Sequence, residues 1–100
     1  MKNPAENLSA GAKTFQARNA VYGGSFLTFG GVMAALFPDG LKIEAGDRDS
    51  FNRLGVFVQI ISKCCRYAAK FGSGGHQDSA HDLMVYAAIL ESLAKESVDE

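Results

Sequence analysis

Hydrophobic residues recur every three or four positions in four separate stretches of the chain, and this spacing places them on one face of an α-helix. In the most regular stretch, which begins near residue 49, the apolar row is Phe51, Leu54, Val58, Ile61, Cys65 and Ala68. More apolar residues lie beside this row and widen the hydrophobic surface. The pattern therefore predicts a helix over residues 49–71 that other helices contact from two sides.

Three further helices are predicted, over residues 4–22, 25–37 and 78–95. The first and last carry an apolar stripe, whereas the second is apolar on all sides. A helix of that second kind is typical of a central position or of a subunit interface. Residues 96–100 are acidic and are expected to fray. No strand or internal repeat is evident, so the predicted fold class is all-α, with four helices in a single domain over residues 1–100.

Short polar side chains mark the expected helix starts, because they accept hydrogen bonds from the first free backbone N–H groups. The candidate caps are Asn3, Ser25, either Asp47 or Asp49, and either Asp78 or Ser79.

The length and composition of the chain favour an oligomer. A chain of 100 residues with 47% hydrophobic content forms one small domain, and a domain of this size buries only about two-thirds of the surface that its unfolded chain exposes. Apolar faces that remain on such a domain are usually covered by another copy. The formal net charge of −1 lacks the basic excess that duplex nucleic-acid binding needs.

The two cysteines, Cys64 and Cys65, are adjacent within the third predicted helix. Neighbours on a helix point about 100° apart, so a disulfide between them is disfavoured, and we interpret both as small buried apolar residues in a reducing compartment. The alternative is a reactive thiolate favoured by the flanking cations. With no signal-peptide core and no membrane span evident, the expected location is the cytoplasm, which would be the host cytoplasm for a viral protein.

The main candidate site combines Lys63-x-x-Arg66 near the end of the third helix with Asp78-x-x-x-Asp82-x-x-x-Tyr86 in the fourth. Spacings of three and four place each group on one helical face, so cations and carboxylates are expected to converge across the short connection. Lys and Arg bind phosphate, and carboxylates bind hard cations. The pattern thus favours a ligand with a phosphate group, alone or with a metal.

Arg18 and Tyr22 continue the apolar stripe of the first helix in register. A guanidinium on such a stripe needs an anionic partner if it is buried. Arg18 is therefore expected either to face a ligand, or to pair with a carboxylate or extend to solvent. Tyr86 is open to two interpretations in the same way, as a residue that stacks on a base or as a core residue with a hydrogen-bonded hydroxyl.

The acidic pair also allows two interpretations. Asp78 and Asp82 together could hold one Mg²⁺ weakly, with the rest of the site binding a nucleotide. Alternatively, Asp78 caps its helix and Asp82 pairs with Arg66 or Arg18 as part of an internal ion-pair network. Two histidines lie nearby, His76 and His81, and are either chemical groups of this site or solvated residues at the start of the helix.

Three short motifs follow one another along the chain: Arg18-x-x-x-Tyr22-Gly23, then Lys63-x-x-Arg66, then Asp78-x-x-x-Asp82-x-x-x-Tyr86-Ala87. In these elements the chain resembles the nucleotide modification associated domain family and its small phage-encoded relatives, from about Arg18 to Leu93. That family is similar in helical layout to the all-α nucleoside triphosphate pyrophosphohydrolases of the MazG and dUTPase type. The resemblance implies an oligomeric helical protein that handles a nucleotide or a nucleotide derivative.

The chain departs from the pyrophosphohydrolases at their metal site. Those enzymes hold magnesium with a Glu-Glu-x-x-Glu motif, whereas the third helix here has Gln59, Lys63 and Arg66 at the corresponding places. The expected function is therefore that of a phage-type protein that binds or sequesters a nucleotide without turnover. The alternatives are a degenerate Mg²⁺-dependent nucleotide pyrophosphohydrolase, or a structural helical protein that binds a host factor.

Overall fold

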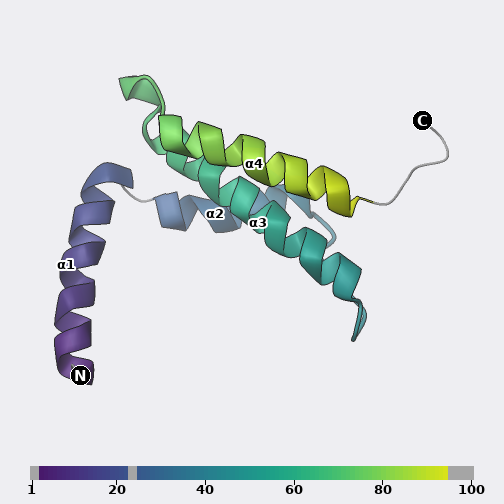
Figure 1. Ribbon diagram of the computed structural model, residues 1–100, viewed down its shortest axis with the longest axis horizontal. Coiled ribbons are helices and arrows are strands. Elements are labelled where there is room, and N and C mark those ends of the chain that lie inside the picture. The colour runs from purple at the N-terminus through teal and green to yellow at the C-terminus, as the bar shows by residue number, and fades with distance from the viewer. Residues whose placement is uncertain (1–2, 23–24, 95–100) are drawn as a thin grey trace.

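The computed structural model describes residues 3–22 and 25–94, and leaves the side chains of residues 21, 22, 25 and 26 undescribed. The fold is all-α, as predicted, and the described residues contain no strand (Figure 1). The elements are α1 (Pro4–Tyr22), α2 (Ser25–Leu36), α3 (Arg48–Ala69), a 3-10 turn η1 (Phe71–Ser73) and α4 (Gln77–Leu93).

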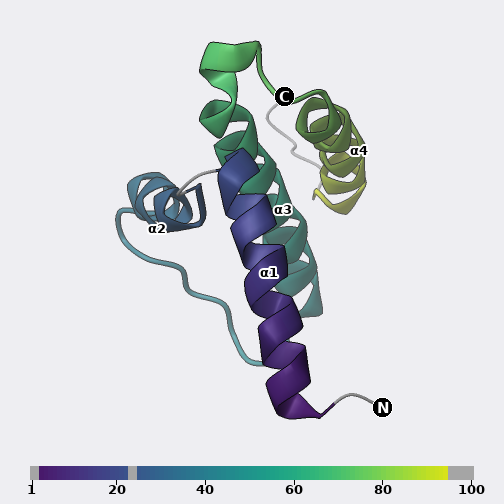
Figure 2. The ribbon, with the colours of Figure 1, turned by 90° about the vertical axis from the view of Figure 1, so that its left-hand side faces the viewer.

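The centre of the molecule is α3, because α2 and α4 both pack against it. Figure 2 shows α2 on one side of α3 and α4 on the other, which confirms the predicted two-sided contact. Ile61 and Cys65 on α3 are the buried apolar residues of this contact. An edge-to-face pair of Phe37 and Phe57, with ring centroids 5.8 Å apart, joins the end of α2 to α3.

Two of the expected helix caps are present. The Asn3 side chain accepts a hydrogen bond from the backbone N–H of Glu6 at 2.9 Å and starts α1. The Asp47 side chain accepts one from the backbone N–H of Ser50 at 3.0 Å and starts α3. Each bond satisfies a donor that a helix start would otherwise leave free. The cap expected at Ser25 lies outside the described side chains.

The prediction for the start of α4 was wrong, because neither Asp78 nor Ser79 is the cap. His76 occupies that position, and its Nδ1 accepts a hydrogen bond from the backbone N–H of Ser79 at 3.3 Å. The Ser79 hydroxyl lies 2.6 Å from the same nitrogen and is fully buried. An imidazole nitrogen thus does the work that a carboxylate or hydroxyl oxygen usually does, and Asp78 is left exposed in the first turn.

In contrast to the other helices, α1 stands apart from the body formed by α2, α3 and α4 (Figure 1). Every side chain described from residue 3 to residue 20 is exposed, including Leu8 and Phe15 of the predicted stripe. Arg18 is exposed as well, so the chain itself does not bury this guanidinium. The apolar stripe that the sequence of α1 predicts is therefore left exposed to solvent by the rest of the chain.

The turn between α3 and α4 depends on glycine at two positions. Gly74 and Gly75 have φ angles of +99° and +94°, which side chains with a Cβ rarely adopt. The backbone N–H of Gly75 donates to the carbonyl of Lys70 at 2.8 Å and closes the end of α3. A Cβ on Gly75 would also lie 2.5 Å from the ring of Tyr67, whereas Gly74 faces open space.

Alanine substitutions across this turn should therefore give a graded loss of stability. We expect Gly72→Ala to be nearly neutral, because that site has open space and no positive φ, and Gly74→Ala to cost about 1–2 kcal/mol through backbone strain alone. Gly75→Ala should cost more than Gly74→Ala, because the Tyr67 ring must also move. Urea unfolding followed by circular dichroism measures the series. Equal effects at Gly74 and Gly75 would contradict the close approach of Tyr67.

The two cysteines differ, which corrects the expectation that both are buried. Cys64 is exposed, whereas Cys65 is buried. Burial, and secondarily the neighbouring Cys64, raises the pKa of the Cys65 thiol above its ordinary value. Since the thiolate is the reactive form, Cys65 should remain protonated and unreactive at a pH where Cys64 reacts.

We therefore expect an aromatic disulfide reagent at pH 8 to label one thiol quickly in the folded protein and the second only as fast as the chain unfolds. Cys64→Ser should abolish the fast phase and leave the slow one, and Cys65→Ser should do the reverse. Stopped-flow absorbance measures both phases. Equal rates for the two thiols in the folded protein would show that Cys65 is accessible.

Candidate functional site

The short connection through η1 places the C-terminal part of α3 beside the first turns of α4 (Figure 1). This arrangement brings Lys63 on α3 to Asp82 on α4, and Lys63 Nζ lies 3.3 Å from Asp82 Oδ2. The Lys63 side chain is only 14% exposed, whereas that of Asp82 is 43% exposed. The cation is thus the more enclosed partner, and its carboxylate faces solvent.

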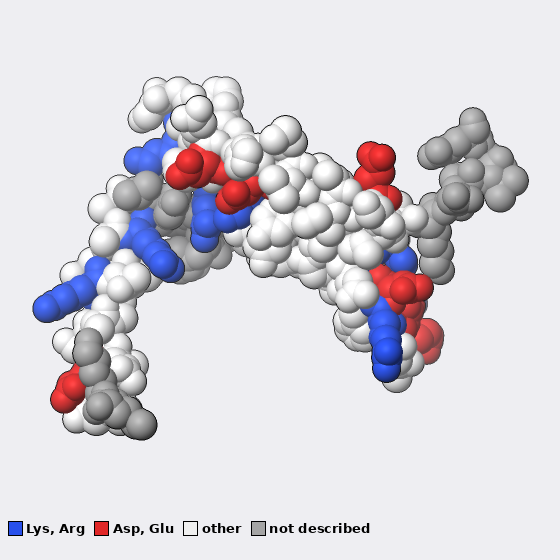
Figure 3. Space-filling view, viewed as in Figure 1, with Lys and Arg blue, Asp and Glu red and all other residues white. Residues whose placement is uncertain are grey.

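Further cations follow Lys63 on the same side of α3. Arg66 lies one turn further along the helix and Lys70 one turn beyond that, and both are half-buried. In Figure 3, Lys and Arg side chains gather on the left of the view, over α1 and the C-terminal part of α3, with Asp and Glu side chains beside them. Lys70 was not among the predicted site residues, although its spacing from Arg66 could have indicated it.

The other predicted site residues take varied positions. Tyr86 is half-buried on α4, one turn after Asp82, while Asp78 is exposed on α4 and Arg18 is exposed on α1. Within the described residues, neither Asp78 nor Arg18 has an ion-pair partner. The side chain of Tyr22 lies outside the described residues. Of the seven predicted residues, Lys63 and Asp82 thus form an ion pair between α3 and α4, and Arg66 follows Lys63 by one turn on α3.

The acidic residues offer few ligands for a metal. Among the residues that the structure describes, no three His, Cys, Asp or Glu side chains lie together as a metal-binding group. Asp78 and Asp82 are one turn apart on α4, and the second already pairs with Lys63. Weak Mg²⁺ binding at these two carboxylates therefore stays a prediction.

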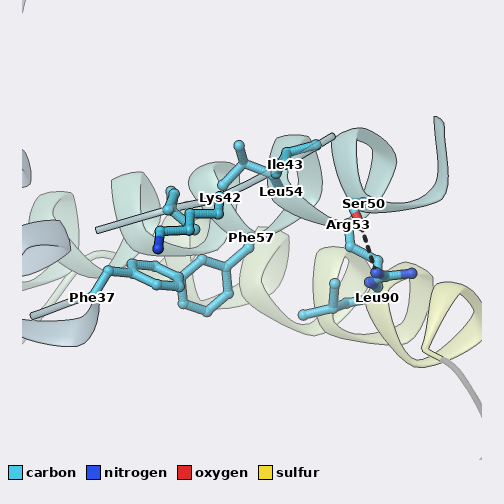
Figure 4. A pocket seen from close by; sticks show the side chains of 9 residues that line it. Phe37, Lys42, Ile43, Ser50, Arg53, Leu54, Phe57 and Leu90 are labelled. Atoms are coloured by element: carbon cyan, nitrogen blue, oxygen red, sulfur yellow. Dashed lines mark hydrogen bonds between the residues drawn. The ribbon is translucent and has the colours of Figure 1, made fainter. Parts of the chain in front are cut away.

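A second feature is an open groove of about 310 Å³ at the other end of α3. Figure 4 shows its walls, which come from the segment after α2, the first half of α3 and the end of α4. The lining residues are Phe37, Leu41, Lys42, Ile43, Ser50, Arg53, Leu54, Phe57 and Leu90. The sequence did not reveal this groove, because most of these residues have the character of ordinary core residues.

Arg53 is the polar residue that distinguishes the groove from core packing. Its Nη2 donates to the Ser50 hydroxyl at 3.0 Å (Figure 4). That hydroxyl in turn donates to Asp47 Oδ2 at 2.6 Å. Arg53 Nη1 is buried, and no described residue supplies it with an acceptor. A guanidinium so placed can donate to an anionic group that enters this largely apolar groove.

Comparisons of the chain with protein-family models, curated proteins and solved structures find no match. A search of the described helices finds none with the length and apolar character needed to cross a membrane.

The ion pair between Lys63 and Asp82 should contribute modestly to stability. A double-mutant cycle with Lys63→Met and Asp82→Asn should give a coupling energy of about 0.5–1 kcal/mol, because one partner is well exposed to water. The coupling should decrease in 1 M salt through screening. Arg48→Met, at the opposite end of α3, serves as the matched control and should not couple to Asp82→Asn. A coupling of zero for Lys63 would mean that the pair does not form in solution.

Proposed function

We propose that this chain is a phage-type nucleotide-binding protein that recognises or sequesters a nucleotide or nucleotide derivative without turnover. The observation that carries the proposal is the half-buried Lys63, which pairs with Asp82 and is followed by Arg66 on α3 and by Lys70 just after the helix ends. Lys63 and Arg66 lie within one turn of each other on α3, and two neighbouring cations of this kind are suited to bind a phosphate group.

The composition of α3 supports binding over hydrolysis. The pyrophosphohydrolases that the sequence resembles place magnesium-binding carboxylates on this helix, where this chain has the exposed Gln59 and the cations Lys63 and Arg66. A cation can bind phosphate but cannot hold Mg²⁺. In this proposal Asp78 and Asp82 bind the base, the ribose or one weakly held Mg²⁺, and Tyr86 helps to shape the nucleotide site.

One observation favours a structural role instead. Because Lys63 and Asp82 already neutralise one another at 3.3 Å, they can act as an internal link between α3 and α4 with no ligand. In that case the chain would be a helical protein that binds a host factor through its surface. The experiment must therefore measure ligand affinity and ligand-free stability separately.

Mass spectrometry of the denatured, freshly purified protein should reveal a co-purified nucleotide. Calorimetric titration with ribo- and deoxynucleoside mono- and triphosphates should then give binding that survives EDTA, with no release of pyrophosphate. Lys63→Ala and Arg66→Ala should each weaken the binding roughly 10- to 150-fold, which corresponds to about 1.5–3 kcal/mol for a charge-assisted hydrogen bond. Their ligand-free melting temperatures should change little, because phosphate-binding cations repel one another in the empty site.

Arg48→Ala removes an exposed arginine at the far end of α3 and serves as the matched control, so it should leave affinity unchanged. Severe ligand-free destabilisation by Lys63→Ala and Arg66→Ala, with no nucleotide bound by the parent protein, would favour the structural role. Steady pyrophosphate release that disappears in Asp82→Asn would instead make the protein a pyrophosphohydrolase.

A further inference from the structure

The single chain exposes far more surface than a monomer of its mass. Its accessible area is 7817 Å², whereas monomeric proteins of 10.7 kDa expose about 5,500 Å². Its radius of gyration is 17.0 Å, against about 13 Å for a compact domain of 100 residues. The surplus of roughly 2,300 Å² exceeds the ~800 Å² per partner that a standard stable interface buries.

One uncovered element is α1, a helix of 19 residues whose described side chains are all exposed. Isolated helices of about this length are marginal in water, and most helices in proteins depend on packing of an apolar face. The α1 sequence also contains Gly11, Thr14 and two asparagines, which are weak helix formers. Its apolar stripe includes Leu8, which is 76% exposed, so the packing that supports this helix must come from outside the chain.

The outer side of α4 is the complementary surface. From Leu83 to Leu90 every residue of α4 is apolar or aromatic, so the helix has apolar groups both toward α3 and away from it. Met84, Val85 and Ile89 are exposed on this outer side, and Met84 is 63% exposed. A helix that is apolar all round is normally covered on all sides.

The charges of the two helices also complement one another. After its first turn, the charged residues of α1 are the cations Lys13 and Arg18. The charged residues of α4 are carboxylates: Asp82 pairs with Lys63 of α3, whereas Asp78 and Glu91 are exposed. A helix with an apolar stripe and flanking cations therefore matches an apolar face with flanking carboxylates.

We propose that α1 packs in trans: two copies of this chain associate, and the α1 helix of each copy covers the outer face of α4 in the other. Such an exchange is isologous and closed, because the same two chains each donate α1 to the other and receive α1 from it. It buries surface on both elements that a single chain leaves exposed. The inference does not depend on nucleotide binding and can fail or succeed independently of it.

Light scattering and sedimentation at micromolar concentration should give the mass of two chains of 10.7 kDa each. Leu8→Glu on α1 and Met84→Glu on α4 should each raise the dissociation constant at least tenfold, since each puts a charge into the interface. Both residues are exposed in the single chain, so neither change disturbs the packing of α2 and α4 on α3. Ser9→Glu, on an exposed neighbour that points about 100° away from Leu8, is the matched control and should leave association unchanged.

Amide hydrogen exchange tests whether α1 is the helix that docks. In the parent protein the amides of α1 should be protected, and Met84→Glu should remove this protection although the substitution is on another helix. The amides of α3 should remain protected in Leu8→Glu and in Met84→Glu, which would show that the body of α2, α3 and α4 remains folded. A concentration-independent monomer, an oligomer insensitive to Met84→Glu, or α1 protection that survives dissociation would each overturn the proposal.

Discussion

The packing of α3 between α2 and α4 is the constraint on which the rest of the structure depends. Its buried side chains, Ile61 and Cys65, lie in the C-terminal half of a helix of 22 residues that is contacted from two sides. Cations lie near both ends of α3, with Arg48 and Arg53 in its first two turns and Lys63 and Arg66 in its C-terminal half. The same packing that makes the core also brings Lys63 beside Asp82 of α4.

A body of three helices is too small to cover all of its own apolar residues. With so few buried side chains, this chain exposes apolar groups on α1, α2 and α4 together. These exposed groups and the concentrated cations have different consequences. The apolar faces favour association through the hydrophobic effect, which is non-directional, while the cations favour a ligand of opposite charge and defined geometry. One chain thus presents an assembly surface and a charged site that need not coincide.

The features predictable from the sequence were those that depend on local spacing. The four helices and the two-sided contact of α3 follow from periodicity. The convergence of cations and carboxylates follows from their places on either side of a short turn, although the predicted partner of Asp82 was Arg66 or Arg18, and the ion pair that the structure shows is with Lys63. Features that depend on how the helices pack against one another were not predictable. The exposure of Cys64 and the groove around Arg53 are set by how far α2 and α4 extend along α3, which spacing does not encode.

The turn after α3 connects local structure to the site, because it sets the rotation of α4. Gly75 can approach the Tyr67 ring only without a Cβ, and His76 then starts the helix so that Ser79 is buried against the body. Each residue of a helix is rotated by about 100° from the one before it. With Ser79 facing inward, Asp82, three residues later, returns to nearly the same side and faces α3 at Lys63. A start displaced by one residue would turn that carboxylate away from α3 and leave the half-buried lysine without its counter-charge. The short glycine turn is therefore as much a part of the charged site as the residues that carry its charge.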